Sequence, residues 1–347
     1  MEAPVIAALI ALGGVLVGMF GRDIIMPTLM ARQKRSHDLL DRDDERIRAR
    51  RELVRLYADP LLAAVRSLRF RLNEVITPGQ SRYLLAESPK IPFFEYKRTS
   101  TLYRLAALLG WISAFRRERS HLDPDDPERY AFAADPIAEI ERSLADGQHV
   151  EEQRVIELLR LWSVPENAIS DSKQRIRLSA EIDGVRQEFL SEKKSLSPAD
   201  LNETDQVLLA RKCGHLVSAY SNIEIPAKLI DSRADQASIF LGIKEAYIYR
   251  DWQTAIGDLM IVTATGGSRR FDVIGFGEFE DRYLKAHSNR PEAEESTDRR
   301  WFDRLDALFH DLDMAKDGMF DARRLQIKNL HQACVALEKY LTERPPP

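Results

Sequence analysis

Five side chains between residues 250 and 270 are the clearest candidates for binding chemistry. Arg250, Trp252 and Asp258 lie in the stretch YIYRDWQTAIGDLMIV, and Arg269 with Arg270 follows a pair of glycines. Glycines beside two guanidinium groups are suited to a backbone nest that binds a phosphate or an anionic headgroup. The plainer interpretation is a helix packed closely on a hairpin, with Trp252 in the core and a solvated basic tip. The residues alone leave both interpretations open.

Metal chemistry is not indicated by the spacing of acids, histidines and cysteines. Residues 313–324 resemble a calcium loop in three acids and a glycine, but Ala315 and Arg324 occupy two ligand positions. His331 and Cys334 lie three residues apart, yet the four ligands of a structural zinc site are not found at their usual spacings. We therefore expect no metal site and no cofactor.

The composition excludes several classes of protein. The formal net charge is −4, which argues against a nucleic-acid-binding polycation. The only cysteines, Cys213 and Cys334, are far apart in sequence, so a disulfide framework is not indicated. The chain contains no GxSxG, HExxH, GxGxxG or P-loop motif. These features favour a role other than catalysis.

The N-terminal stretch APVIAALIALGGVLVGMFG predicts a membrane anchor. Residues 3–21 carry no charge and, as a helix, would span roughly 28 Å, close to the ~30 Å hydrocarbon thickness of a bilayer. Glu2 precedes the segment and no small-residue cleavage site follows it, so a removed signal peptide is not favoured. A buried soluble helix is the other interpretation.

Basic residues predict the orientation of this anchor. Arg22, Arg32, Lys34 and Arg35 all follow the segment and none precedes it, which places the N-terminus outside and the body in the cytosol. Gly14 and Gly18 form a GxxxG, a spacing that lets two membrane helices approach closely. Frequent glycines in membrane helices are the simpler explanation of this pair.

The remaining chain is predicted to be mostly helical. A sevenfold apolar stripe runs through residues 40–75, and Asp59 before Pro60 predicts a break between two helices. The stripe indicates either a face packed on a core or a coiled coil. A long central helix is expected from Ser100, and amphipathic patterns predict two helices after residue 296. The glycine pair, with β-branched and aromatic residues on both sides, predicts a hairpin near residues 260–279.

These observations predict a mainly α fold, with a single N-terminal transmembrane helix followed by a multi-helix cytosolic bundle and one small β-hairpin. The expected divisions are an anchor and basic flank (1–35), a membrane-proximal charged helix (36–59), a helical cytosolic body (60–341) and a disordered tail (342–347). The body is one domain or two, with a boundary near 147–171.

The expected function is that of an interaction, scaffold or regulatory module on the cytosolic face of the membrane. Its expected partners are the bilayer, through residues 3–21, and a protein partner or a second copy of the chain. The alternative is a membrane-tethered enzyme or ligand-binding protein with a helical pocket for a phosphorylated or lipid-like ligand.

Overall fold

A computed structural model describes the chain at residues 48, 52, 54–122, 134–145, 147–195, 197–266, 268–288, 298–315 and 321–343. This part of the chain is mainly helical and contains one small antiparallel hairpin, as the sequence predicts. Residues 3–21, with Gly14 and Gly18, lie outside the described residues. No helix in the described part is both long enough and apolar enough to cross a membrane.

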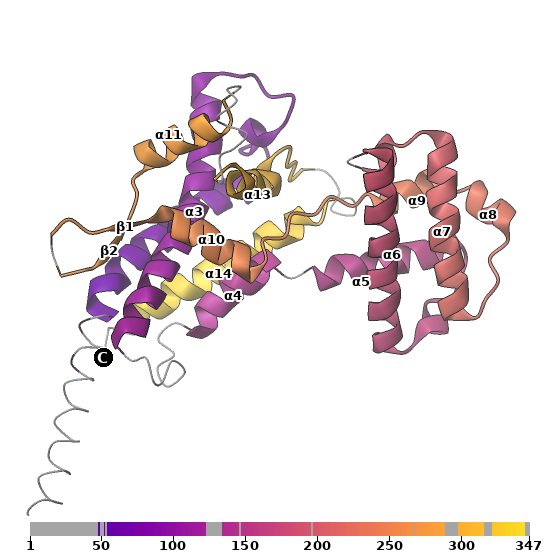
Figure 1. The fold of residues 1–347 in the computed structure, drawn as a ribbon, viewed down its shortest axis with the longest axis horizontal. Coiled ribbons are helices and arrows are strands. Elements are labelled where there is room, and N and C mark those ends of the chain that lie inside the picture. The colour runs from indigo at the N-terminus through magenta and orange to yellow at the C-terminus, as the bar shows by residue number, and fades with distance from the viewer. Residues whose placement is uncertain are drawn as a thin grey trace, which may run out of the picture.

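The helices form two lobes (Figure 1). The first lobe contains a helix at residues 54–76 and the following elements: η2 (Arg82–Leu84), α3 (Pro92–Leu122), α4 (Ala134–Ala145), α10 (Arg250–Met260), β1 (Ile261–Thr263), β2 (Phe271–Val273), α11 (Phe276–Ala286), α13 (Arg299–Phe309) and α14 (Arg323–Glu343). The second lobe contains α5 (Gln148–Leu161), η3 (Glu166–Ile169), α6 (Ser172–Lys193), η4 (Pro198–Asp200), α7 (Glu203–Ser221), α8 (Ala227–Asp231) and α9 (Ala234–Leu241). The second lobe is therefore inserted between two halves of the first.

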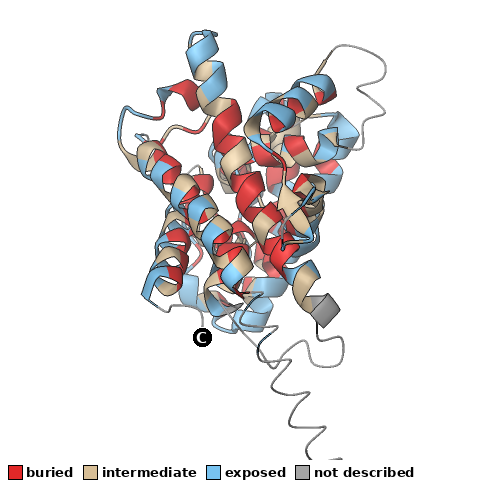
Figure 2. Cartoon of the chain, turned by 90° about the vertical axis from the view of Figure 1, so that its left-hand side faces the viewer, coloured by how far each residue is buried: buried red, intermediate tan, exposed pale blue. Residues whose placement is uncertain are grey.

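Each lobe has its own hydrophobic core. One large cluster of buried side chains joins the two halves of the first lobe, and a second cluster is confined to residues 155–241. Figure 2 shows the first lobe from the side, where the buried faces of its helices turn inward and the exposed faces turn outward. The sequence analysis placed a boundary near 147–171 but none near the return of the chain at 242–249.

The helix at residues 54–76 runs without interruption through Pro60, where the sequence predicts a break. Leu61, Leu68 and Val75 of the sevenfold stripe are almost completely buried in the first core. A proline inside a helix removes one backbone hydrogen bond, at a cost of roughly 3 kcal/mol. Burial of this continuous apolar face, at about 1.5–3 kcal/mol for each large side chain, outweighs that cost.

Helix α3 is the central helix of the first lobe. It packs against α10, α11, α13 and both strands, and Leu105 and Leu108 in its middle are fully buried. It begins at Pro92 rather than at the predicted Ser100. Proline is favoured at the first position of a helix, where no backbone N–H is required, so the apparent break is the helix start.

The hairpin is shorter than the sequence predicts. Ile261 pairs with Val273, and Thr263 pairs with Phe271, in an antiparallel register of three residues per strand. The chain then enters α11 at Phe276, so the end of the predicted 260–279 hairpin is helical. Gly275 occupies the N-cap in an extended conformation, and Glu278 in the first turn favours the helix dipole.

Candidate functional site

Helix α10 carries three of the five predicted site residues and is fixed by a close contact with α3. A Cβ atom added at Gly257 would lie 2.4 Å from Ser113 Oγ and 2.7 Å from the Leu109 carbonyl oxygen. The absence of a side chain therefore allows the two helices to touch through their backbones. The sequence predicts a helix packed closely on the hairpin, whereas at Gly257 the close contact of α10 is with α3.

Trp252 lies at the first turn of α10, partly buried against the first core. The exposed ring of Tyr249 meets it edge-on at 4.7 Å between centroids, and the Arg304 guanidinium carbon lies 3.1 Å from the Trp252 ring centroid. Burial, and then the positive charge of Arg300, lowers the pKa of Arg304. Tyr249, Trp252 and Arg304 form a cationic and aromatic cluster, which we call the Trp252 cluster. Arg250 is exposed two positions before Trp252.

Arg304 is the member of this cluster that sequence reasoning missed. Its Nε atom is buried and has no hydrogen-bond partner among the described residues. It belongs to α13, whose sequence signals only an amphipathic helix with Phe302, Leu305 and Phe309 on the buried face. An arginine on the flank of such a stripe is ordinary, and only the fold brings it to Trp252.

Asp258 lies at the other end of α10 and does not contribute to the Trp252 cluster. Its carboxylate forms an ion pair at 2.8 Å with Arg117 of α3, and both side chains are about four-tenths exposed. Six residues of helix separate Trp252 from Asp258 by roughly 9 Å along the axis. Asp258 therefore ties α10 to α3 rather than facing a pocket at Trp252.

The hairpin arginines occupy a third location. The Arg269 guanidinium lies 5.3 Å from the ring centroid of Trp111 and 3.8 Å from the Asp272 carboxylate, while Arg270 is exposed. Burial, and then Glu118, raises the pKa of neighbouring Tyr57 to about 12. One of the two glycines before the arginines lies outside the described residues, so the proposed nest is not described. The five predicted residues therefore do not converge on one site.

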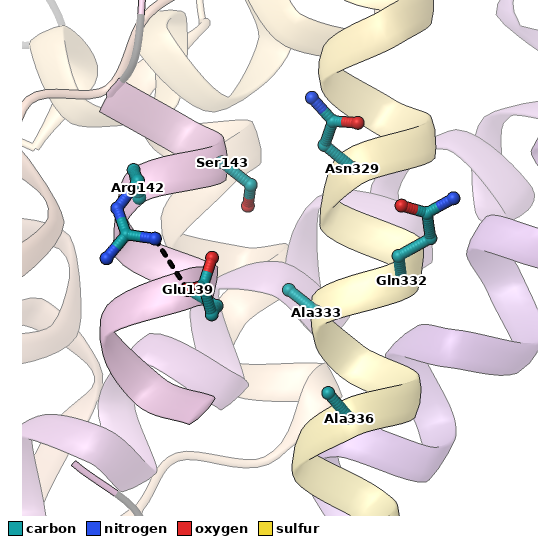
Figure 3. A pocket seen from close by; sticks show the side chains of 7 residues that line it. All are labelled: Glu139, Arg142, Ser143, Asn329, Gln332, Ala333 and Ala336. Atoms are coloured by element: carbon teal, nitrogen blue, oxygen red, sulfur yellow. Dashed lines mark hydrogen bonds and ion pairs between the residues drawn. The ribbon is translucent and has the colours of Figure 1, made fainter. Parts of the chain in front are cut away.

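A surface groove lies between α4 and α14 (Figure 3). Its volume is about 380 Å³, and its walls are formed by Glu139, Arg142, Ser143, Asn329, Gln332, Ala333 and Ala336. Glu139 is the one acid among the described residues that line it, and its carboxylate is paired with Arg142 at 2.5 Å. The groove thus offers amide and hydroxyl hydrogen bonds but no charged group free for acid–base chemistry.

The candidate metal ligands are occupied in other ways. Cys334 is buried in the first core, and burial raises the pKa of its thiol to about 12. Burial, and then Arg69, lowers the pKa of His331. Asp321 binds Arg323 at 2.7 Å, and Arg324 donates to the Met314 carbonyl oxygen. Within the described residues, no three acids, histidines or cysteines lie close enough together to hold a metal ion.

The base of the second lobe is closed by two buried glutamines. The Ile248 N–H donates to the Leu144 carbonyl at 2.8 Å, so the outgoing and returning segments lie side by side. Gln326 Nε2 donates to the carbonyls of Leu144 and Ala246, both at 3.0 Å. Gln253 binds the same two segments, at the Glu141 and Ile248 carbonyls.

Charged side chains join the second lobe to this base. Arg154 of α5 and Arg186 of α6 both bind Glu245 in the returning segment, at 3.2 and 2.7 Å. Arg186 forms a second ion pair, with Asp183, at 2.5 Å. Arg154 is only 1% exposed, so its charge depends on these partners. No sequence motif indicates this junction, because its members come from distant segments.

Comparison of the chain with protein-family models, with curated proteins and with solved structures finds no match. Its function is therefore argued from its own residues.

Proposed function

We propose that the chain is a membrane-anchored interaction module, in which the first lobe is a platform and the second lobe is the partner-binding unit. The observation that carries this proposal is the insertion of a lobe with its own hydrophobic core, confined to residues 155–241, into the first lobe. The paired segments at Leu144 and Ile248 fix this unit to the platform at one place. Such an arrangement presents a helical surface without disturbing the core that carries it.

A groove on the second lobe is the proposed contact surface. It lies between α5 and α9, has a volume of about 360 Å³, and includes the apolar side chains of Leu161, Ile239 and Phe240. Ile239 is 44% exposed and lies in the groove beside Leu161 and Phe240, so a partner that enters the groove would cover several apolar side chains together. The groove is flanked by Arg160, which pairs with Glu157 at 3.0 Å.

The test compares two exposed isoleucines of the second lobe. In membranes solubilised with mild detergent, Ile239→Glu is expected to reduce the mass of the native complex measured by blue-native electrophoresis. Ile176→Glu, at a 49% exposed residue of α6 outside the groove, is the matched control and should leave the mass unchanged. If the mass of the native complex were the same for the wild type and both variants, the proposed contact surface would be contradicted.

The membrane anchor is supported by the sequence of residues 3–21 and by the basic residues that follow it. Carbonate extraction of membranes, combined with protease protection of a C-terminal tag, tests it directly. We expect the chain in the membrane pellet and the tag protected in intact cells. Release of the chain by carbonate would contradict the predicted anchor. Digestion of the tag from outside would contradict the predicted orientation.

The GxxxG spacing supports a second way of forming complexes. If two copies pack through Gly14 and Gly18, replacing both with Leu lowers the oligomer size in detergent, since leucine keeps the helix backbones apart. An unchanged size would leave the second-lobe groove as the remaining contact proposed here.

The alternative function is ligand binding by a tethered protein, and the Trp252 cluster favours it. Arg304 forms no ion pair with any described residue, so an anionic ligand stacked near Trp252 would supply the missing charge. Arg269→Ala with Arg270→Ala tests whether the hairpin takes part. Unchanged binding of anionic ligands and lipids by this double variant would confine the alternative to the Trp252 cluster.

A further inference from the structure

Three cations gather where the helix at residues 54–76 meets α3. Arg71 comes from the first helix, and Lys97 and Arg104 come from α3. Lys97 and Arg104 lie seven positions apart on α3, and Arg71 contacts Ser100, which lies between them in the same helix. Every residue of the connection between the two helices is described, so the surroundings of this cluster are defined.

One carboxylate serves these cations. Glu74 forms an ion pair with Lys97 and another with Arg71 at 3.2 Å. Arg71 Nη2 donates to Ser100 Oγ at 3.1 Å, and Arg104 Nη1 donates to the Ser67 carbonyl at 3.0 Å. Within the described residues, no second acid forms an ion pair with any of the three cations.

Burial makes this imbalance of charge costly. The Arg71 side chain is only 5% exposed and that of Lys97 only 19% exposed. The Nε atom of Arg71 has no hydrogen-bond partner among the described residues. Charges removed from water are normally paired, because an unpaired buried charge costs several kcal/mol. Within the described residues, two of the three positive charges are therefore left without a carboxylate of their own.

Aromatic rings shape one side of the cluster. Lys97 Nζ lies 4.9 Å from the ring centroid of Tyr83, and the Arg71 guanidinium lies 5.7 Å from the same ring. The Tyr83 hydroxyl is 3.5 Å from Thr101 Oγ1. The ring holds both cations over one face, so their positions are set before any ligand arrives.

We propose that Lys97 and Arg104, backed by the buried charge of Arg71, bind a phosphate dianion carried by a soluble phosphorylated small molecule. A phosphomonoester carries between −1.5 and −2 charges at pH 7 and offers three strong acceptor oxygens, which suits a guanidinium and an ammonium group. Glu74 competes with the ligand for Lys97. The site is separate from the second-lobe groove and from the five residues predicted from sequence.

The position of the cluster favours a soluble ligand over a lipid headgroup. Arg71 lies 17 positions after Val54, so the helix carries it roughly 25 Å from the end at which the N-terminal segment joins. An anchor at residues 3–21 would hold the Val54 end of this helix, and not the Arg71 end, nearest to the bilayer. A soluble phosphorylated molecule and a phosphorylated lipid headgroup would both present a phosphate dianion. The experiment below distinguishes these two sources.

The test is isothermal titration of the full chain in detergent with inorganic phosphate, at constant ionic strength set by chloride. Saturable binding is expected, and it should weaken as the pH falls through the second pKa of inorganic phosphate, where the dianion gains a proton. Lys97→Gln and Arg104→Gln should each weaken binding roughly tenfold, the effect of losing one charge-assisted hydrogen bond. Arg211→Gln, an equal change of charge at an exposed pair in the second lobe, is the matched control.

Glu74→Gln separates a ligand site from a structural ion pair. The proposal requires tighter phosphate binding in this variant, because the competing carboxylate is gone while all three cations remain. Lower stability with no gain in phosphate affinity would overturn the proposal, as would wild-type affinity in Lys97→Gln. Vesicles of phosphatidylcholine with and without a phosphoinositide form the second arm. Binding to the phosphoinositide vesicles without binding of free phosphate would overturn the assignment to a soluble ligand.

Discussion

Two glutamines, Gln253 and Gln326, fasten the segments that lead into and out of the second lobe. Both side chains are 2% exposed, and each donates to two backbone carbonyls of these segments. A buried carbonyl without a donor is costly, which explains why a polar side chain is tolerated here. No sequence pattern indicates the partners of either glutamine, because a glutamine on an amphipathic helix is ordinary until the partner segments are known.

Gln326→Leu is expected to lower the free energy of unfolding by about 1–3 kcal/mol, because the Ala246 carbonyl loses the donor described for it and the Leu144 carbonyl keeps only the Ile248 N–H. Gln332→Leu, on the exposed face of the same helix, is the control and should change it by less than about 0.5 kcal/mol. Urea denaturation followed by circular dichroism measures both. Equal effects would mean that the hydrogen bonds of Gln326 do not stabilise the base.

Glu245→Gln tests the charges that join the lobes. Removing the carboxylate leaves the buried Arg154 with only its longer ion pair to Asp183, at 3.7 Å, and breaking a buried pair costs roughly 3–5 kcal/mol. Because Glu245 is 23% exposed, we expect the lower end of this range. Lys244→Gln breaks a neighbouring exposed pair with Asp311 and should cost at most about 1 kcal/mol. Similar denaturation midpoints for the two variants would contradict the role of Glu245.

At the scale of elements, the apolar periodicities predicted which faces are buried. Leu330, Cys334 and Leu337 of α14 all face the first core, as their spacing of three and four residues indicates. Proline was the less reliable signal. Pro60 lies inside a continuous helix and Pro92 begins one, because the burial of neighbouring side chains and the position within the helix decide what a proline does.

The contact between α10 and α3 depends on Gly257. Gly257→Ala is expected to destabilise the first lobe by about 1–3 kcal/mol, since the new Cβ would meet the backbone of α3 at Leu109. Gly184→Ala in α6 is the matched control, because nothing lies within 4 Å of its added Cβ. This second change should stabilise the chain by up to about 1 kcal/mol, the difference in helix propensity. Thermal unfolding measures both variants: the unfolding midpoint should fall for Gly257→Ala and rise for Gly184→Ala. Equal shifts of the two midpoints would contradict the prediction.

At the scale of the whole molecule, the sequence predicted the mainly helical class but not the insertion. The first core joins residues before position 145 to residues after position 245, and no local pattern reports which distant helices share a core. The five predicted site residues show the same limit. Arg250 and Trp252 lie two positions apart in the first turn of α10, whereas Asp258 and Arg269 are held by different residues of α3.

Each lobe contains one buried cysteine, so thiol labelling reports on the two lobes separately. Cys213 lies in the second core and Cys334 in the first, and burial raises the pKa of each thiol to about 12. A neutral, buried thiol reacts slowly, so neither is expected to react with iodoacetamide in the native protein at pH 8. With rising urea, mass spectrometry of the peptides should show whether the two become reactive together or in sequence. Rapid labelling of either cysteine without urea would contradict this packing.

The insertion also fixes the order in which the chain can fold as it is synthesised. The second lobe is complete once α9 has left the ribosome, whereas the helix at residues 54–76 and α3 must wait for α10, α13 and α14. At about 5–20 residues per second, this wait is on the order of ten seconds. During that time Leu105, Leu108 and other apolar side chains of α3 lack the helices that later cover them. The unfinished first lobe is therefore the stage of synthesis at which this protein most needs a chaperone.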